Sequence, residues 1–193
     1  MNRATNEGWL RGAPGNPKGA GIAPSTLHRS STLKLLLCLC VGVSTAQAPV
    51  AATSLLHRKA PEFARTDLHH RKLDLRTYRG KVVLLDFWAT WCDSCQLEMP
   101  RFVAWQTQYG SRGLQIIGIS MDDDPELARK MYEKQRLNYP VAMGDDKLGR
   151  LYGGVLGLPL AFLIDRQGKV QALFRGEADL NLIEEEFKRL LRP

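Results

Sequence analysis

Two cysteines separated by two residues are the part of this sequence best suited to chemistry, in the run Trp91-Cys92-Asp93-Ser94-Cys95. A cysteine thiolate attacks a disulfide to form a mixed disulfide, and a second thiolate then displaces it. Residues three positions apart on a helix share one face, so the sulfur of Cys95 can reach that of Cys92. The spacing therefore predicts a dithiol that exchanges with disulfides.

The elements expected around the pair indicate which cysteine attacks. Residues 82–89 form a continuous apolar run, typical of a strand buried on both faces. A helix is expected from Cys92 to about Tyr109, and the free N–H groups at its start favour a thiolate at Cys92. The carboxylate of Asp93 opposes this effect. We expect Cys92 to be the exposed nucleophile and Cys95 the more buried resolving thiol.

The remaining pattern predicts an α/β domain. Strands are expected at 114–120, 141–142, 161–164 and 170–174, and Leu73 and Leu75 indicate a further short strand. Helices are expected after the capping acids Asp122-Asp123-Asp124, at 148–152 and at 179–191, where Glu184-Glu185-Glu186 forms a solvated face. Strands that alternate with helices predict a mixed central sheet with helices on both faces.

The first 46 residues differ from the rest of the chain. A short apolar run at 35–43 follows Lys34 and precedes small residues, and it is too short to span a membrane. This pattern predicts a signal peptide at 1–46, cleaved after Ala46, then a linker at 47–57 and a domain at 58–193. An uncleaved membrane anchor is the alternative. Cleavage predicts a periplasmic product.

Export changes the meaning of the four cysteines. Cys38 and Cys40 leave with the leader, so the mature chain keeps only Cys92 and Cys95. A disulfide between residues this close gains little from loop entropy. The pair is therefore expected to be redox-active and not a structural staple.

Composition limits the other possibilities. The chain has 193 residues, 44% of them hydrophobic, which is ordinary for a globular protein. Its 27 basic residues against 20 acidic ones form no clustered basic face, so no nucleic-acid partner is expected. His57, His69 and His70 lack a metal-ligand pattern. No nucleotide or flavin motif is present, and we expect a monomer without cofactor or metal.

The longer pattern resembles a known family. The run from Asp86 to Cys95 resembles the active-site run of thioredoxins. Together with the segments 60–63, 80–83, 98–100 and 157–165, it resembles the TlpA/ResA-type thioredoxin-like proteins that bacteria export. The resemblance covers roughly 58–193. It implies a thioredoxin-like fold and thiol:disulfide oxidoreductase activity.

The resemblance also implies roles for residues outside the cysteine pair. Pro159 matches a cis-proline that faces the pair and exposes the Leu158 backbone to an extended substrate, with a trans proline in a loop as the alternative. Trp91 itself is expected to be a platform residue and not a chemical participant. Asp86 matches a buried acid that deprotonates the resolving thiol, with a solvated strand-edge acid as the alternative. Glu98 matches the family's second acid, with an exposed helix residue as the alternative.

Three functions remain open at this point. The first is reduction of disulfides in periplasmic proteins such as apo-cytochrome c, with electrons from a membrane thiol donor. The second is copper handling, because Cys92 and Cys95 are soft ligands that Met99 could supplement. The third is a non-catalytic binding domain on the same scaffold, against which the intact cysteine motif argues.

Overall fold

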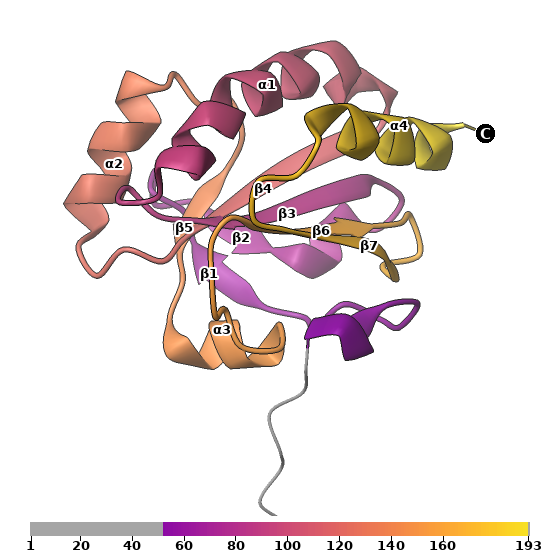
Figure 1. Ribbon diagram of the computed structural model, residues 1–193, viewed down its shortest axis with the longest axis horizontal. Coiled ribbons are helices and arrows are strands. Elements are labelled where there is room, and N and C mark those ends of the chain that lie inside the picture. Colours follow the sequence, from indigo (N-terminus) through magenta and orange to yellow (C-terminus); the bar gives the residue numbers. More distant parts are fainter. Residues whose placement is uncertain (1–51, 193) are drawn as a thin grey trace, which may run out of the picture. The chain divides into compact units, whose positions relative to one another are not determined.

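Five strands form the central sheet of this computed structural model, which describes residues 52–192 (Figure 1). The strand order is β5-β4-β3-β6-β7. Strands β3, β4 and β5 are parallel, whereas β6 runs antiparallel to β3 and β7 antiparallel to β6. The mixed sheet predicted from the sequence is thus confirmed. The strands span Val82–Trp88 (β3), Leu114–Ser120 (β4), Val141–Met143 (β5), Leu160–Ile164 (β6) and Val170–Arg175 (β7).

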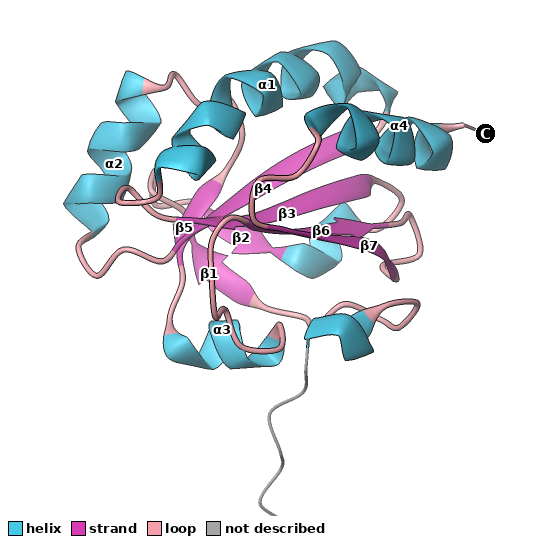
Figure 2. Cartoon of the chain, viewed as in Figure 1, coloured by secondary structure: helices cyan, strands magenta, loops and turns pink. Residues whose placement is uncertain are grey.

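Helices cover both faces of this sheet, as expected (Figure 2). One core cluster joins the sheet to α1, α2 and α4, and the other joins it to α3 and to the segments before β3. These segments include the hairpin of β1 (Ala64–Thr66) and β2 (Lys72–Asp74). The four α-helices span Asp93–Tyr109 (α1), Pro125–Lys134 (α2), Asp146–Leu151 (α3) and Leu180–Leu191 (α4).

Strand β3 is buried along its whole length, which explains its apolar run without a two-residue period. Side chains alternate between the two core clusters, so Asp86 shares the α1 side with Leu84 and Trp88. Its neighbours on the adjacent strands are Gly118 and Ala161, two of the smallest residues. An acid is therefore placed in the middle of the core directly beneath α1.

The folded body begins earlier than the sequence pattern indicates. Residues 52–57 were expected within a linker, but Ala52 and Leu55 are buried in the second core cluster. Gly153 has a φ of +90°, and a Cβ there would lie 2.0 Å from the backbone nitrogen of Ala52. The glycine makes room for this segment, a contact that local composition cannot reveal.

Smaller differences concern the segments before β3. Residues 64–66, for which the sequence pattern predicts no strand, pair with β2 as β1. Leu75, expected in a strand, instead begins a 3₁₀ helix that ends at Tyr78. Asp74 caps this helix by accepting a hydrogen bond from the Arg76 N–H. A side-chain cap thus ends the strand one residue early.

The expected leader, residues 1–46, lies outside the described residues. Within 52–192, no helix is both long and apolar enough to cross a bilayer.

Candidate active site

The cysteine pair lies at the start of α1, directly after the central strand. Cys92 and Cys95 are joined by a disulfide. Cys92 is the N-cap residue, and its Sγ accepts a hydrogen bond from the Cys95 N–H at 3.3 Å. The Ser94 Oγ lies 3.6 Å from the same sulfur. Donors of the first helical turn therefore surround the sulfur at which a thiolate would form.

The two sulfur-bearing residues differ less in exposure than expected. In this disulfide form Cys92 is 6% exposed and Cys95 2%. Cys92 is the more accessible of the two, but it is not the exposed residue that the sequence pattern predicts. The reason is that Cys92 packs in the core cluster beneath α1, together with Trp88 and Met99.

Trp91 forms an exposed apolar surface next to the pair. Its side chain is 69% exposed, whereas Trp88, three residues earlier, is fully buried. A large exposed aromatic residue beside a reactive group is typical of a surface that contacts a partner. Trp91 is therefore placed where a platform residue would be.

The peptide bond between Leu158 and Pro159 is cis, as the family resemblance implies. Pro159 directly precedes β6, and Leu160 pairs with Phe87 near the end of β3. Since β3 leads into the cysteine loop, the start of β6 lies at the same edge of the sheet. Leu158 is half-buried and Pro159 is buried.

Asp86 is buried in the core and not solvated at a strand edge. The residue is 2% exposed, and its Oδ1 has no hydrogen-bond partner among the described residues. Burial raises the pKa of Asp86 well above its usual range, and the nearby Glu98 raises it further. Such a carboxyl takes up a proton readily, which suits it to act as a base.

Glu98 is also buried, which removes the alternative of an exposed helix residue. It lies one turn past Cys95 on α1 and is 7% exposed. Burial, with a smaller contribution from Glu177, raises the pKa of Glu98 to about 7. Its carboxyl therefore changes protonation near neutral pH, where a general acid or base is most effective.

Two more polar groups belong to this buried set, and the sequence pattern did not reveal them. The Tyr139 hydroxyl and the Trp88 Nε1 are buried without a hydrogen-bond partner in the described part of the chain. Burial raises the pKa of Tyr139 well above its usual range, and Asp86 and Glu98 add to this effect. Tyr139 precedes a short strand, a position that carries no sequence signal for a site.

The structure corrects the prediction that Asp122 belongs to the cap of α2. Only Asp124 caps α2, by accepting a hydrogen bond from the Glu126 N–H at 2.9 Å. Asp122 is instead 6% exposed and bonds to Thr90, in the loop that leads to the cysteines. Three acidic residues before a proline are typical of a helix cap, so the local sequence could not predict the contact between Asp122 and Thr90.

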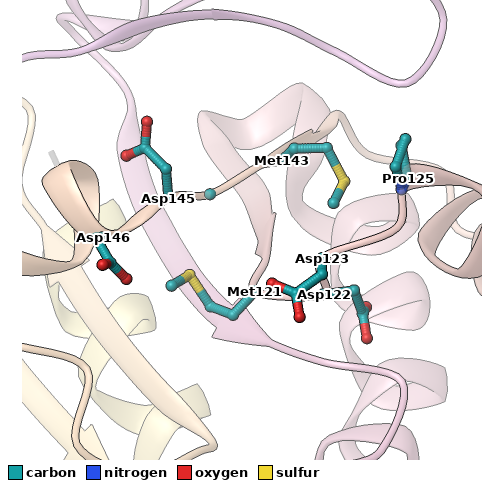
Figure 3. A pocket seen from close by; sticks show the side chains of 8 residues that line it. Met121, Asp122, Asp123, Pro125, Met143, Asp145 and Asp146 are labelled. Atoms are coloured by element: carbon teal, nitrogen blue, oxygen red, sulfur yellow. The ribbon is translucent and has the colours of Figure 1, made fainter.

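A pocket of about 470 Å³ lies beside Asp122 (Figure 3). Asp122 and Asp123 lie on one side of it, and Asp145 and Asp146 on the other. Within residues 52–192, no group of three or more His, Cys, Asp or Glu side chains is arranged to hold a metal ion.

The sheet order and the position of the redox pair define the class of the protein. It is a thiol:disulfide oxidoreductase with a thioredoxin-like fold.

Comparisons with known proteins agree with this class. The model of the AhpC/TSA family matches residues 56–173. The thiol-disulfide oxidoreductase ResA of Bacillus thuringiensis subsp. konkukian is 34% identical over 160 residues, covering 81% of this chain and 91% of its own. ResA of Bacillus subtilis is 26% identical over 167 residues, covering 86% and 92%.

A solved structure of a thiol:disulfide interchange protein is also similar to this chain. The thiol:disulfide interchange protein of the thioredoxin family from Chlorobium tepidum has a TM-score of 0.65 and 28% identity, covering 69% of this chain and 96% of its own. Because the AhpC/TSA family model matches more than half of the chain, the chain belongs to this family.

Proposed function

We propose that this protein is exported and reduces disulfides in other exported proteins, with Cys92 as the nucleophile. The Cys92 thiolate attacks one sulfur of the substrate disulfide, whose S–S bond breaks and releases a first thiolate. The Cys95 thiolate then attacks the Cys92 sulfur of the mixed disulfide. This step forms the Cys92–Cys95 disulfide and releases the second substrate thiolate, so that two electrons pass to the substrate.

The hydrogen bond from the Cys95 N–H to the Cys92 sulfur carries this proposal. In the disulfide form this sulfur accepts a hydrogen bond from the first turn of the helix, and a negative charge formed there on reduction would interact favourably with the helix dipole. The sulfur of Cys95 lies inside the first turn, with its residue only 2% exposed. This difference supports attack by Cys92 and resolution by Cys95.

The buried acids supply the proton acceptor that resolution requires. The Cys95 thiol must lose its proton before it can attack the mixed disulfide. Asp86 lies on β3 beneath α1 and Glu98 lies on α1 itself, and the pKa of each is raised. We assign Asp86 as the base and Glu98 as the acid that exchanges the proton with solvent near neutral pH.

The substrate is expected to lie across Trp91 and the segment before β6. The exposed ring of Trp91 offers an apolar contact surface. The backbone of Leu158, which precedes the cis-proline at the same edge of the sheet, is suited to pair with an extended substrate segment. Apo-cytochrome c is a substrate of this kind, since its cysteines must be reduced before haem attachment.

Reduction in an oxidising compartment requires a continuous supply of electrons. We infer a membrane thiol donor that returns the Cys92–Cys95 disulfide to the dithiol, and a protein that acts as a monomer. The leader at 1–46 supports export to the periplasm. Mass spectrometry of the mature protein should find a chain that begins near Gln47, whereas an intact leader in the membrane fraction would indicate an anchor.

The roles of the two cysteines are tested by trapping. With insulin as the disulfide substrate, Cys95→Ser should accumulate a mixed disulfide on Cys92, because the second step is blocked. Cys92→Ser should form no adduct and should not reduce insulin. Stable adducts on Cys95 in the Cys92→Ser variant would reverse the assignment. A largely oxidised pair in living cells would contradict the reducing direction.

A further inference from the structure

The carboxylate of Asp122 is buried at the end of β4 and is held by hydrogen bonds from two residues. The Thr90 N–H donates to both of its oxygens, at 3.0 and 3.1 Å, and the Thr90 hydroxyl donates to Oδ1 at 2.7 Å. The Ser120 hydroxyl donates to Oδ2 at 2.8 Å. A buried carboxylate is costly unless hydrogen bonds compensate for lost water, and here most of them come from the loop before Cys92.

Thr90 is held from its other side as well. The Gln96 Nε2, on α1, donates to the Thr90 carbonyl oxygen at 2.8 Å. Next to this, the Met121 N–H donates to the Trp88 carbonyl oxygen at 2.8 Å. Both backbone polar groups of Thr90 are therefore fixed, one by the segment after β4 and the other by the helix that carries the cysteines.

We propose that Asp122 is a positioning residue, which acts through Thr90 to orient the Cys92 sulfur toward a docked protein disulfide. This inference rests on the proposed role of Cys92 as the nucleophile. Only Trp91 separates Thr90 from Cys92, so the direction of the Thr90 backbone sets the course of the chain into the N-cap. Attack requires the sulfur to lie in line with the substrate S–S bond.

Neighbouring acids do not share this role. Asp123, which lines the same pocket (Figure 3), is exposed and forms no hydrogen bond with residues 88–92 in the described structure. Asp123 is only one residue further along the chain from the cysteines than Asp122. Asp123→Asn is therefore a matched control that removes a charge from this segment without removing the contact to Thr90.

The test compares a protein disulfide with a small one. In the Cys95→Ser background, the rate of adduct formation is measured with insulin and with oxidised glutathione. Asp122→Asn and Thr90→Val should each slow the reaction with insulin by about tenfold or more, since misplacement by about 1 Å can cost a hundredfold. The reaction with glutathione, which approaches from many directions, should change little. Asp123→Asn should react like the parent with both.

A conservative variant separates orientation from folding. Thr90→Ser keeps the hydroxyl donor and should react with insulin faster than Thr90→Val, while near-UV circular dichroism checks that each variant is folded. Equal losses with insulin and glutathione, or an unchanged insulin rate in folded Asp122→Asn and Thr90→Val, would overturn the inference. An adduct missing from the parent itself would refute the proposed function of Cys92 instead.

Discussion

Glu98 makes the stability of the protein depend on pH at the level of a single residue. Burial raises its pKa from 4.5 to about 7, so the unfolded chain releases the proton first as the pH rises. Stability is therefore lost between pH 4.5 and about 7. The loss amounts to at most about 3.5 kcal/mol, since each unit of pKa corresponds to about 1.4 kcal/mol.

Glu98→Gln should remove this part of the pH dependence. Urea unfolding of the oxidised protein is measured below and above the range of titration, at about pH 4.5 and about pH 8. The free energy of unfolding should fall less with pH in the variant than in the natural protein. Asp86 contributes with the same sign and stays in both proteins. Identical pH profiles would show that Glu98 is solvated in the folded state.

Removal of the Tyr139 hydroxyl should make the protein more stable. The hydroxyl is buried without a partner in the described residues, so it has lost its hydrogen bonds to water. Tyr139→Phe should raise the free energy of unfolding by about 1 kcal/mol, because the desolvation cost of an unpaired polar group is about 1–3 kcal/mol.

Tyr109 supplies the control for this prediction. Its hydroxyl donates to the Glu184 Oε1 at 2.9 Å, so the same change removes a hydrogen bond to a charged group. Tyr109→Phe should lower the stability where Tyr139→Phe raises it. A loss of stability in both variants would mean that the Tyr139 hydroxyl has a partner in solution.

Asp86→Asn tests the assignment of the base. An ionised Asp86 accepts the proton of Cys95, so the mixed disulfide should resolve more slowly in the variant at a pH where the natural carboxyl is ionised. At lower pH, where the natural carboxyl holds its own proton, the two rates should converge. Stopped-flow measurement of resolution across this range provides the profile. Equal rates at every pH would leave Asp86 a structural residue.

At the scale of the elements, one glutamate joins α4 to α1. The Glu184 carboxylate accepts hydrogen bonds from Trp105 and Tyr109 and pairs with Arg101 and Lys188. These partners, Lys188 first, lower the pKa of Glu184 to about 2. The expected solvated face at 184–186 is thus wrong for its first member, whose side chain is 13% exposed.

Glu184→Ala should lower the free energy of unfolding at neutral pH by about 2 kcal/mol, the scale of hydrogen bonds to a charged group. The exposed Glu185→Ala is the control and should change it little. The contribution of Glu184 is present above pH 4.5 and is lost as the pH falls toward about 2. Chemical unfolding at neutral and acidic pH measures both effects.

Strands that are buried on both faces could be predicted from the sequence. Segments whose structure depends on contacts with residues far along the chain could not. β3 and β4 have apolar runs because nearly every residue is buried. β1 has three residues of mixed burial and forms because β2 lies beside it. A short segment of this kind carries no periodic signal.

The candidate site divides in the same way. Cys92 and Cys95 were identified by their spacing, and Asp86 by its match to the buried acid of the family that the sequence resembles. Asp122 was assigned to a cap because Asp-Asp-Asp-Pro is a typical start of a helix, and its true partner, Thr90, lies 32 residues away. Contacts between strand ends depend on the sheet register, which local patterns do not contain.

At the scale of the whole molecule, the folded body includes the segment before residue 58. Ala52 and Leu55 are buried in the second core cluster, and Leu56 forms a parallel bridge with Val170, the first residue of β7. A chain that begins at residue 58 should be less stable than one that begins at Gln47, by about 2 kcal/mol for the lost burial of one leucine. Urea unfolding compares the two. Equal stability would show that the segment is dispensable for folding.

The tryptophans differ so much in exposure that their fluorescence can report the binding of a substrate protein. Trp91 is 69% exposed, whereas Trp88 and Trp105 are at most 1% exposed. In a chain that begins at Gln47, and therefore lacks Trp9, iodide, a quencher that stays in water, should extinguish the emission of Trp91 and leave that of the two interior rings. A substrate protein seated over the cysteines would shield Trp91 from iodide. Substrate binding could then be followed by tryptophan fluorescence in a variant that lacks both thiols and therefore transfers no electrons.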